Sequence, residues 1–359
     1  MGAVGESVER VVATQHAKWG TNAVDAEVFG TGDPAEMAAI VDRFCRDELG
    51  AETEEGLFYG ASSGCVLGVR LRDGGEVVIK AYQQRWQAPY LRAVQSFQAH
   101  AVGRGLPCAT PLRGPTALVP GRPHQAMVES VLADPGLRPF STAAERRVSA
   151  AGLARLIAVC RELPVAPELA DHPLRRLSDG LYGEPHSPLF DFAATAEGAE
   201  WIDEIARRAL LQREADGRPP VVAHADWSAR NVRLDERRLL AVYDWDSLAL
   251  VPESTAVGQA AATWSVTADP GGTEFPALRD IIAFMADYEG AAGNRLDETQ
   301  RRAAGAAAAY ALAYTARCEH ALEVTGRARP DQHAAHDRLA DAGSALLDLG
   351  RDRRGDRGG

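Results

Sequence analysis

The feature that most constrains this chain is a polar loop followed by a short predicted hairpin. The loop spans residues 224–231 and reads His-Ala-Asp-Trp-Ser-Ala-Arg-Asn. Two β-like runs follow at 232–234 and 239–243, and the polar residues 235–238 separate them. Short apolar runs on either side of a polar turn are typical of a β-hairpin. This part of the chain is therefore predicted to be a loop that continues directly into a two-stranded ribbon.

Oxygen-bearing side chains lie at the open end of the predicted ribbon. Asn231 precedes the first run and Asp244 follows the second, so antiparallel pairing places them roughly 5 Å apart across the strands. Asp226 lies on the loop just before them. Grouped carboxylate and amide oxygens suit Mg²⁺, which takes one or two such ligands and fills its octahedron with water and phosphate oxygens. The segment is therefore a candidate site for magnesium and phosphate.

The same residues resemble the catalytic motif of a known family. Asp226 and Asn231 have the Asp-x-x-x-x-Asn spacing of a phosphotransferase catalytic loop, and Asp244 follows where a second, metal-binding aspartate is expected. With His224 included, the pattern resembles the aminoglycoside phosphotransferase and choline kinase branch of the kinase-like fold, although Asp246 stands where Glu is more usual. An ordinary acidic surface hairpin is the alternative interpretation. It is disfavoured because the polar positions and the hairpin all agree with the motif.

The resemblance implies an α+β protein with a two-lobed, protein-kinase-like fold. A small β-rich N-lobe that binds nucleotide would span residues 33–128, and a larger helical C-lobe with the catalytic and substrate-binding residues would span 129–349. Asp33 is the predicted N-cap of the first helix of the N-lobe. Residues 1–32 show no clear period and are expected to form a loosely attached arm, and 350–359 a disordered tail.

The resemblance also implies a role for each polar residue of the motif. Phosphoryl transfer asks a protein mainly for positioning and charge neutralisation. Asp226 would orient the acceptor hydroxyl and take its proton, while Asn231 and Asp244 would hold Mg²⁺ against the phosphates of ATP or GTP. His224 is expected to fix the loop through backbone hydrogen bonds rather than to enter the chemistry. Asp246 would either assist the metal or brace the hairpin.

A small-residue loop at 60–64 reads Gly-Ala-Ser-Ser-Gly and lies between two predicted strands. Backbone N–H groups in such a loop can approach a phosphate, and Ser62, Ser63 and Gly64 are the predicted nucleotide contacts. The same letters match the Gly-x-Ser-x-Gly nucleophile elbow of α/β-hydrolases, with Ser62 as the nucleophile. An elbow must lead into a helix, whereas residues 65–71 are β-like and lead into a turn. The hydrolase alternative is therefore disfavoured.

Lys80 ends an apolar strand, and Lys18 and Lys80 are the only lysines among 39 basic residues. A compact ammonium suits the α- and β-phosphates of a nucleotide, so Lys80 is a predicted nucleotide ligand; an edge lysine that merely reaches solvent is the alternative. In the kinase-like fold the next helix, predicted here at 89–102, carries a glutamate that pairs with this lysine. This helix has none: Gln95 falls near that position and Gln98 lies one turn on.

Residues 125–132 resemble the strand and hinge that join the two lobes. Backbone groups at Glu129 and Val131 are accordingly expected to meet the adenine edge of the nucleotide. Glu253 is the candidate substitute for an aspartate that anchors the next helix in the family. Three more helices are predicted near 276–289, 297–324 and 330–349.

Bulk composition restricts the partners. The chain has 359 residues, enough for two lobes, and a formal net charge of -11. Such a surface repels nucleic acid and anionic membranes and would attract a cationic acceptor. Five dispersed cysteines without a CxxC pair, and an N-terminus without a secretory signal, favour reduced thiols in the cytoplasm.

The first functional hypothesis is an ATP-dependent O-phosphotransferase that acts on a hydroxyl of an aminoglycoside, another antibiotic or an amino-sugar-like molecule. The alternatives are a kinase of a primary metabolite of the choline, homoserine or sugar type, and a catalytically silent nucleotide-binding protein. The missing helix glutamate motivates the silent alternative. By resemblance, Glu319, Glu323 and Asp331 are available to bind amino groups of an acceptor, although acidic residues on helices are usually only solvated.

Overall fold

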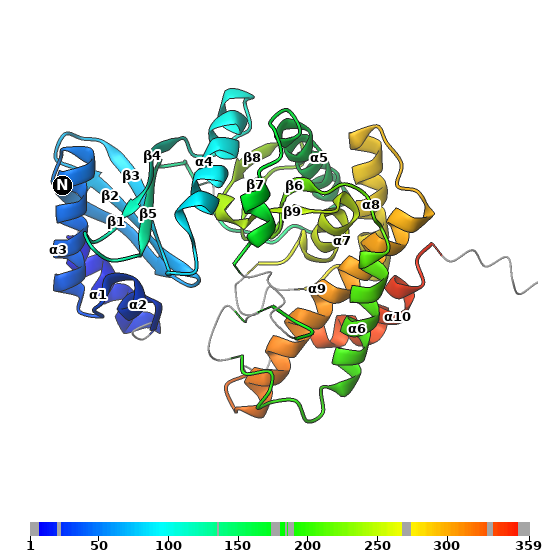
Figure 1. Ribbon diagram of the computed structural model, residues 1–359. Coiled ribbons are helices and arrows are strands. Elements are labelled where there is room, and N and C mark those ends of the chain that lie inside the picture. Colours follow the sequence, from blue (N-terminus) through cyan, green and yellow to red (C-terminus); the bar gives the residue numbers. More distant parts are fainter. Residues whose placement is uncertain are drawn as a thin grey trace, which may run out of the picture. The chain divides into compact units, whose positions relative to one another are not determined.

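The computed structural model of the chain is shown in Figure 1. It describes residues 7–19, 23–134, 136–173, 180–183, 185, 190–267, 274–328 and 333–350. These residues fall into two compact units. The first contains the described residues up to Val102 together with Cys108–Ala133, and the second contains Gly103–Pro107 and the described residues from Asp134 onwards. The first unit therefore ends at Ala133, close to residue 128, where the sequence places the end of the N-lobe.

The first unit is built around a five-stranded antiparallel sheet with the strand order β1-β2-β3-β5-β4 (Figure 1). The strands are β1 (Thr53–Ala61), β2 (Gly64–Leu71), β3 (Glu76–Tyr82), β4 (Pro111–Ala117) and β5 (Gln125–Ser130). Side chains alternate between the two faces of a strand. In the observed register Leu67, Ile79 and Val128 share one face, while Lys80 and Glu129 share the other.

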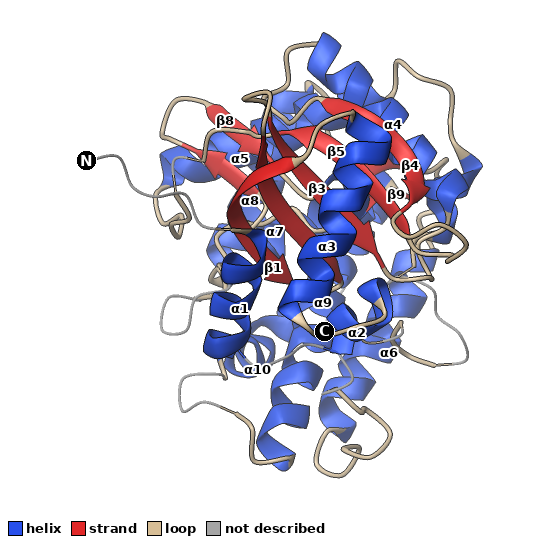
Figure 2. Ribbon diagram, turned by 90° about the vertical axis from the view of Figure 1, so that its left-hand side faces the viewer, coloured by secondary structure: helices blue, strands red, loops and turns tan. Residues whose placement is uncertain are grey.

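Three helices cover the face that carries Ile79 and Val128 (Figure 2). They are α1 (Val8–Trp19), α2 (Ala23–Phe29) and α3 (Pro34–Phe44), and a π-helical turn, η1 (Cys45–Leu49), continues α3. Their apolar residues form one core with the sheet, including Val8, Val12, Val28, Met37, Val41 and Phe44. As predicted, Asp33 caps α3: its Oδ1 accepts the backbone N–H groups of Ala35 and Glu36 at 2.9 and 3.0 Å.

The helices α1 and α2 pack tightly on the sheet, so the predicted loose arm does not hold for residues 8–19 and 23–29. Asp25 of α2 is fully buried, and its carboxylate bonds His16 of α1 at 2.8 Å and accepts the hydroxyl of Tyr59 on β1. Burying a carboxylate is tolerated here because both oxygens are hydrogen-bonded. This packing was missed at the level of sequence, because the apolar pattern of Val8, Val11 and Val12 covers little more than one helical turn.

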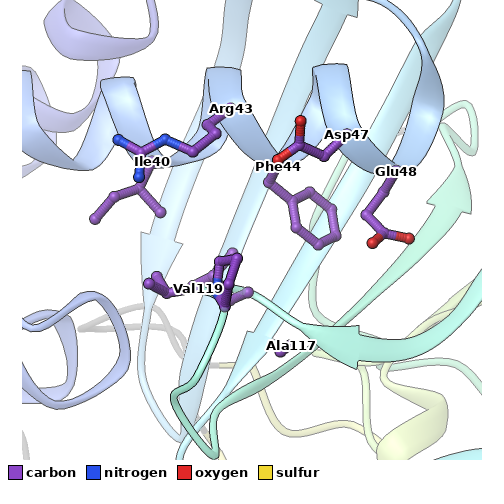
Figure 3. Close-up of a pocket in the computed structure, with 9 residues that line it drawn as sticks. Ile40, Arg43, Phe44, Asp47, Glu48, Ala117 and Val119 are labelled. Carbon is purple, nitrogen blue, oxygen red and sulfur yellow. The ribbon is translucent and has the colours of Figure 1, made fainter.

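The helix α4 (Ala88–Gly103) packs on the opposite face of the sheet through a bond from Gln98 to Glu129. A small pocket lies instead on the α3 side, between Phe44 and the segment Ala117–Pro120 (Figure 3). Phe44 belongs to the core on the face away from Lys80. This pocket is therefore separate from the candidate nucleotide residues.

The second unit is mostly helical. Its helices are α5 (Ala143–Cys160), α6 (Glu200–Glu214), α7 (Glu253–Thr263), α8 (Leu278–Ala292), α9 (Glu298–Val324) and α10 (Ala334–Leu347), with short 3-10 turns η2 (Pro167–Asp171) and η3 (Trp245–Ser247). Two antiparallel strand pairs complete it: β6 (Val221–His224) with β9 (Leu248–Val251), and β7 (Val232–Leu234) with β8 (Leu239–Val242). The long α9 runs beside α6, α7 and α10 (Figure 1).

Small residues allow α7 and α9 to pack closely. A Cβ placed on Gly258 of α7 would lie only 1.9 Å from the carbonyl oxygen of Ala304 on α9.

Of the three predicted C-terminal helices, α8 and α9 confirm two, and α10 confirms the third from Ala334 on. The predicted residues 330–332 of that helix, and residues 351–359 of the predicted tail, lie outside the described residues. Within the described parts of the chain, no helix combines the length and apolar character needed to cross a membrane.

Candidate active site

Asp226 is held by two side chains of its own loop. The amide Nδ2 of Asn231 donates to the backbone oxygen of Asp226 at 2.9 Å and to its carboxylate Oδ2 at 2.8 Å. The guanidinium Nη2 of Arg230 lies 3.3 and 3.4 Å from the two carboxylate oxygens. The carboxylate is half-buried. Its orientation is therefore set by the loop itself, as a catalytic group requires.

The hairpin brings Asn231 and Asp244 to the same end, as the sequence predicted. Val232 pairs with Val242, and the backbone N–H of Tyr243 donates to the carbonyl of Asn231 at 2.8 Å. Asp244 follows directly in the left-handed conformation, with φ 57 and ψ 49. Among the described residues it is the only non-glycine with a positive φ. Such a backbone costs about 1 kcal/mol or more and is typical of functional sites.

Local hydrogen bonds keep Asp244 in this strained conformation. Its carboxylate Oδ2 accepts the hydroxyl of Ser247 at 2.8 Å, and its carbonyl accepts the backbone N–H of Ser247 at 2.9 Å. The indole N–H of Trp245 donates to the carbonyl of Val242 at 3.1 Å. The short turn η3 thus fixes where the Asp244 side chain leaves the hairpin.

His224 has the structural role that the sequence suggested. Its Nε2 lies 3.0 Å from the carbonyl oxygen of Tyr243, and its Nδ1 accepts the backbone N–H of Asp226 at 3.2 Å. This pattern corresponds to the neutral tautomer with the proton on Nε2. The imidazole therefore ties the start of the loop to the far end of the hairpin.

The charges of Asp226 and Arg230, both on the loop, shift each other's pKa. Burial by itself would raise the pKa of Asp226, but the Arg230 guanidinium and the Asn231 hydrogen bond hold that pKa below its usual value. In return, Asp226 raises the pKa of Arg230, and Asp244 contributes to the same shift. Asp226 is therefore a stabilised carboxylate at neutral pH.

Arg233 is a buried clamp that sequence reasoning missed. Its Nη1 donates to the carbonyls of Ala229, Arg230 and Val232 at 3.0 to 3.2 Å. Its Nε bonds the carboxylate of Asp134 at 2.8 Å. A charged residue inside the otherwise apolar strand Val-Arg-Leu was the available signal. One guanidinium thus holds the end of the loop and the start of the hairpin together.

Replacing Arg233 by methionine is expected to lower the free energy of unfolding of the second unit by about 2 kcal/mol, because buried carbonyls lose their donor. Urea unfolding followed by tryptophan fluorescence measures this change, since Trp227 and Trp245 are buried near the loop. Arg237→Met, at an exposed position of the same hairpin, is the matched control and should be nearly neutral. Equal midpoints for the two variants would contradict the clamp.

Side chains of two helices, α5 and α7, form hydrogen bonds with the loop. The indole N–H of Trp227 donates to Ser149 of α5 at 3.0 Å. From α7, Gln259 donates to the carbonyl of Ala225, and Thr263 donates to the carbonyl of Trp227 at 3.1 Å. The backbone of the loop is therefore anchored to rigid elements of its own unit.

In the first unit, the Gly60–Gly64 segment forms the turn between β1 and β2. Ala61 pairs with Cys65, and the backbone N–H of Ser62 donates to the carbonyl of Gly64 at 2.9 Å. A strand and not a helix follows Ser62, so the geometry of a nucleophile elbow is absent from this described segment. The tight turn, with Ser62 at its exposed tip, has the small side chains that a phosphate-binding loop needs.

Lys80 pairs with a residue that sequence reasoning assigned otherwise. Its Nζ lies 3.7 Å from Oε1 of Glu129. The backbone of Glu129, which was expected to meet a nucleotide, instead lies inside the sheet between Val78 of β3 and Pro111 of β4. Val131 follows β5 and stays a candidate for that contact.

The loop, the hairpin and Lys80 all lie in a part of the chain that matches a known family. A family model described as the phosphotransferase enzyme family matches residues 67–271, more than half of the 359 residues. The chain belongs to the phosphotransferase enzyme family. The matched span includes Lys80, the loop at 224–231 and Asp244. The resemblance inferred from these residues is confirmed, and this phosphotransferase matches no curated protein sequence.

Solved structures share the fold of this phosphotransferase. The amicoumacin kinase hAmiN, in complex with AMP-PNP, Ca²⁺ and Ami, has a TM-score of 0.55 and 12% identity, covering 82% of this chain and 88% of that chain. A Ralstonia eutropha JMP134 protein described as a candidate aminoglycoside phosphotransferase has a TM-score of 0.51 and 14% identity, covering 87% of this chain and 96% of that chain. These likenesses confirm the predicted α+β, kinase-like fold.

The residues at the mouth of the hairpin suit a divalent cation. Both hydrogens of the Asn231 amide are directed at Asp226, so its oxygen is the end left to face a ligand. With the Asp244 carboxylate, this gives the small set of hard oxygen donors that Mg²⁺ takes from proteins. Within the described ranges, no group of three or more His, Cys, Asp and Glu side chains could hold a metal. A metal ion at this end of the hairpin would therefore meet an amide as well as a carboxylate.

Two acidic residues of the phosphotransferase have structural partners. Glu319 accepts the backbone N–H groups of Ala335 and His336 at 3.1 and 2.8 Å, so it caps the start of α10. Glu253 accepts the hydroxyl of Tyr288 at 2.6 Å and pairs with Arg161, which anchors α7 as the sequence suggested. Glu319 is thus engaged rather than open to an acceptor, and Asp331 lies outside the described residues.

Proposed function

We propose that this phosphotransferase moves the γ-phosphoryl group of ATP or GTP to a hydroxyl of a small molecule. The observation that carries the proposal is the Asp226 carboxylate, fixed by Asn231 and Arg230 in a loop that ends beside the strained Asp244. Phosphoryl transfer needs an oriented carboxylate for the acceptor and oxygen donors for a divalent ion. The complex of hAmiN with AMP-PNP and Ca²⁺ supports the use of a nucleotide and a divalent cation by this fold.

In the proposed reaction, Asp226 accepts a hydrogen bond from the acceptor hydroxyl. As the hydroxyl oxygen bonds to the γ-phosphorus, its proton passes to the carboxylate, and the bond from that phosphorus to the bridging oxygen breaks to release the nucleoside diphosphate. Lys80 and the turn at Ser62, Ser63 and Gly64 hold the phosphates. Asn231 and Asp244 would hold Mg²⁺, which when bound neutralises charge on the phosphates.

The acceptor we propose is an aminoglycoside, another antibiotic or an amino-sugar-like molecule. The formal net charge of -11 favours a cationic molecule. The names of the two structural neighbours, an amicoumacin kinase and a member of the aminoglycoside phosphotransferases, support this class. We place the reaction in the cytoplasm, which supplies nucleoside triphosphates and suits the five buried free cysteines.

A screen of hydroxylated acceptors with γ-labelled ATP and Mg²⁺ tests the proposal. Aminoglycosides, amicoumacin-like antibiotics, amino sugars, choline and homoserine form the panel, and transfer of label to any of them establishes the activity. Transfer to choline or homoserine alone would favour a kinase of primary metabolism. Mg-ATP binding without transfer to any acceptor would favour the catalytically silent alternative. The Lys80–Glu129 pair disfavours that alternative, because the lysine has a carboxylate partner.

Replacing Arg230 by methionine is expected to move the acidic limb of the kcat/KM profile to higher pH. Arg230 lowers the pKa of Asp226, so without this cation Asp226 stays protonated up to a higher pH, and a protonated carboxylate cannot take the hydroxyl proton. The pH dependence of label transfer measures the shift. Arg230→Lys keeps the positive charge and should retain most of the low-pH activity. An acidic limb that stays in place in Arg230→Met would mean that Asp226 is not the titrating base.

A further inference from the structure

Lys80 and Glu129 face each other across two neighbouring strands. Lys80 lies opposite Met127, and Glu129 lies two residues further along β5, on the same face of the sheet. Long side chains in this diagonal relation can meet. The side chains of Lys80 and Glu129 are only 9% and 11% exposed, and Nζ and Oε1 are 3.7 Å apart. The register of β3 and β5 therefore creates the pair.

Gln98 holds the other side of the same carboxylate. This fully buried residue of α4 donates through Nε2 to Oε2 of Glu129 at 2.9 Å, and to the carbonyl of Ala109 at 2.9 Å. Cys108 is also close: burial first, and then the Glu129 charge, raise the pKa of its thiol to about 12. One carboxylate oxygen thus faces Lys80 while the other is fixed by an amide.

Gln95, which lies near the helix position where the family carries its glutamate, packs against a strand of the sheet. The side chain of Gln95 lies against Gly114 of β4, where its Oε1 would be 3.0 Å from an added Cβ. In protein kinases the glutamate that pairs with the strand lysine comes from the helix, so the position of that helix controls the pair. In this chain the carboxylate comes from a hydrogen-bonded neighbour strand, and the helix supplies only a neutral amide.

We propose that Glu129 is the residue that positions Lys80 for the nucleotide phosphates, and that Gln98 keeps Glu129 in place. The proposal rests on the function proposed above, in which Lys80 binds those phosphates. Because the pair is built into the sheet, Lys80 is already ordered in the chain without nucleotide. The role of Glu129 is thus one of positioning, with no contact to the reacting atoms.

Lysine NMR tests the positioning directly and without a nucleotide. The chain has only Lys18 and Lys80, so ¹³C-lysine labelling gives two sets of side-chain signals, and Lys18→Arg identifies them. Lys18 is exposed and serves as the internal reference signal. In the wild type, relaxation of the Lys80 Cε group should show restricted motion, and in Glu129→Gln that motion should become clearly less restricted, while the Lys18 signal stays unchanged. Glu129→Gln keeps the shape and an acceptor for Gln98, and its melting temperature reports whether the fold survives.

Nucleotide kinetics supply the second measurement. Glu129→Gln is expected to raise KM for Mg-ATP about tenfold and Gln98→Leu about threefold, while KM for the acceptor stays the same. Gln95→Ala, on the same helix, is the matched control and should leave both the KM values and the Lys80 motion unchanged.

The failures of the two proposals are distinguishable. A wild type that transfers phosphate, combined with a Glu129→Gln variant whose Lys80 motion and KM for Mg-ATP are those of the wild type, overturns the positioning role alone. A wild type that binds no nucleotide overturns the proposed function. If Gln95→Ala and Glu129→Gln mobilise Lys80 equally, the partner assigned to the lysine is wrong.

Discussion

Asp226→Asn is expected to lower kcat for phosphoryl transfer by on the order of 10²-fold or more, with little change in KM for Mg-ATP. The substitution keeps the size of the side chain and an oxygen that can accept from Asn231, but it removes the group that takes the hydroxyl proton. The loop should stay folded, because most of its anchors run through backbone carbonyls and His224. Transfer of label from γ-labelled ATP at saturating substrates measures kcat.

Glu236→Gln is the matched control for that result. Glu236 is an exposed acid on the turn of the same hairpin, so its substitution removes the same unit of charge at a position without a proposed role. This variant should retain wild-type kcat. If Asp226→Asn had the same kcat as Glu236→Gln, Asp226 would not be the general base, and the proposed role of the loop in phosphoryl transfer would be wrong.

Asp244→Asn is expected to lower kcat/KM for Mg-ATP by about 10²-fold and to raise the Mg²⁺ concentration needed for half-maximal activity. Asparagine tolerates the left-handed conformation that Asp244 adopts, so the backbone of the turn should be preserved. The variant loses the negative charge that a divalent cation would meet. Titration of activity with Mg²⁺, at fixed ATP, separates this loss of metal affinity from a general loss of activity.

Asp246→Asn is the control that assigns the metal ligand. Asp246 lies in the same short turn η3 and is largely buried, and its sequence position allowed either a metal-binding or a bracing role. If Asp244 is the ligand, Asp246→Asn should need no more Mg²⁺ than the wild type, whatever its stability. A Mg²⁺ requirement that rises only in Asp246→Asn would transfer the ligand role to that residue.

The structure of the loop at 224–231 was predictable because its contacts are local. The Asn231 side chain donates a hydrogen bond to Asp226, only five residues earlier in the chain. The pairing of Val232 with Val242 follows from the hairpin pattern. The left-handed backbone of Asp244 was not predictable, because Asp is enriched at positive φ but only a small minority of aspartates adopt that conformation. The turn η3 and its bonds to Ser247 create that conformation.

The residues that support the loop from a distance were missed for the opposite reason. Arg233 bonds Asp134, and Ser149 bonds Trp227, across long stretches of chain. Glu319 looked like a free acid on a helix, but α10 folds back so that Glu319 caps it. A side chain's partner depends on which elements pack together, and periodicity does not contain that information.

The sequence by itself determined that Asn231 and Asp244 lie at the same end of one hairpin, since a hairpin brings fixed positions together. It also determined that Lys80 is unusual, because lysine is nearly absent from the chain. Only the tertiary structure showed that Glu129, on a neighbouring strand, pairs with Lys80. The physical reason is strand order. In the sheet β5 lies next to β3, although α4 and β4 separate the two strands in the sequence, and no local pattern specifies which strands become neighbours.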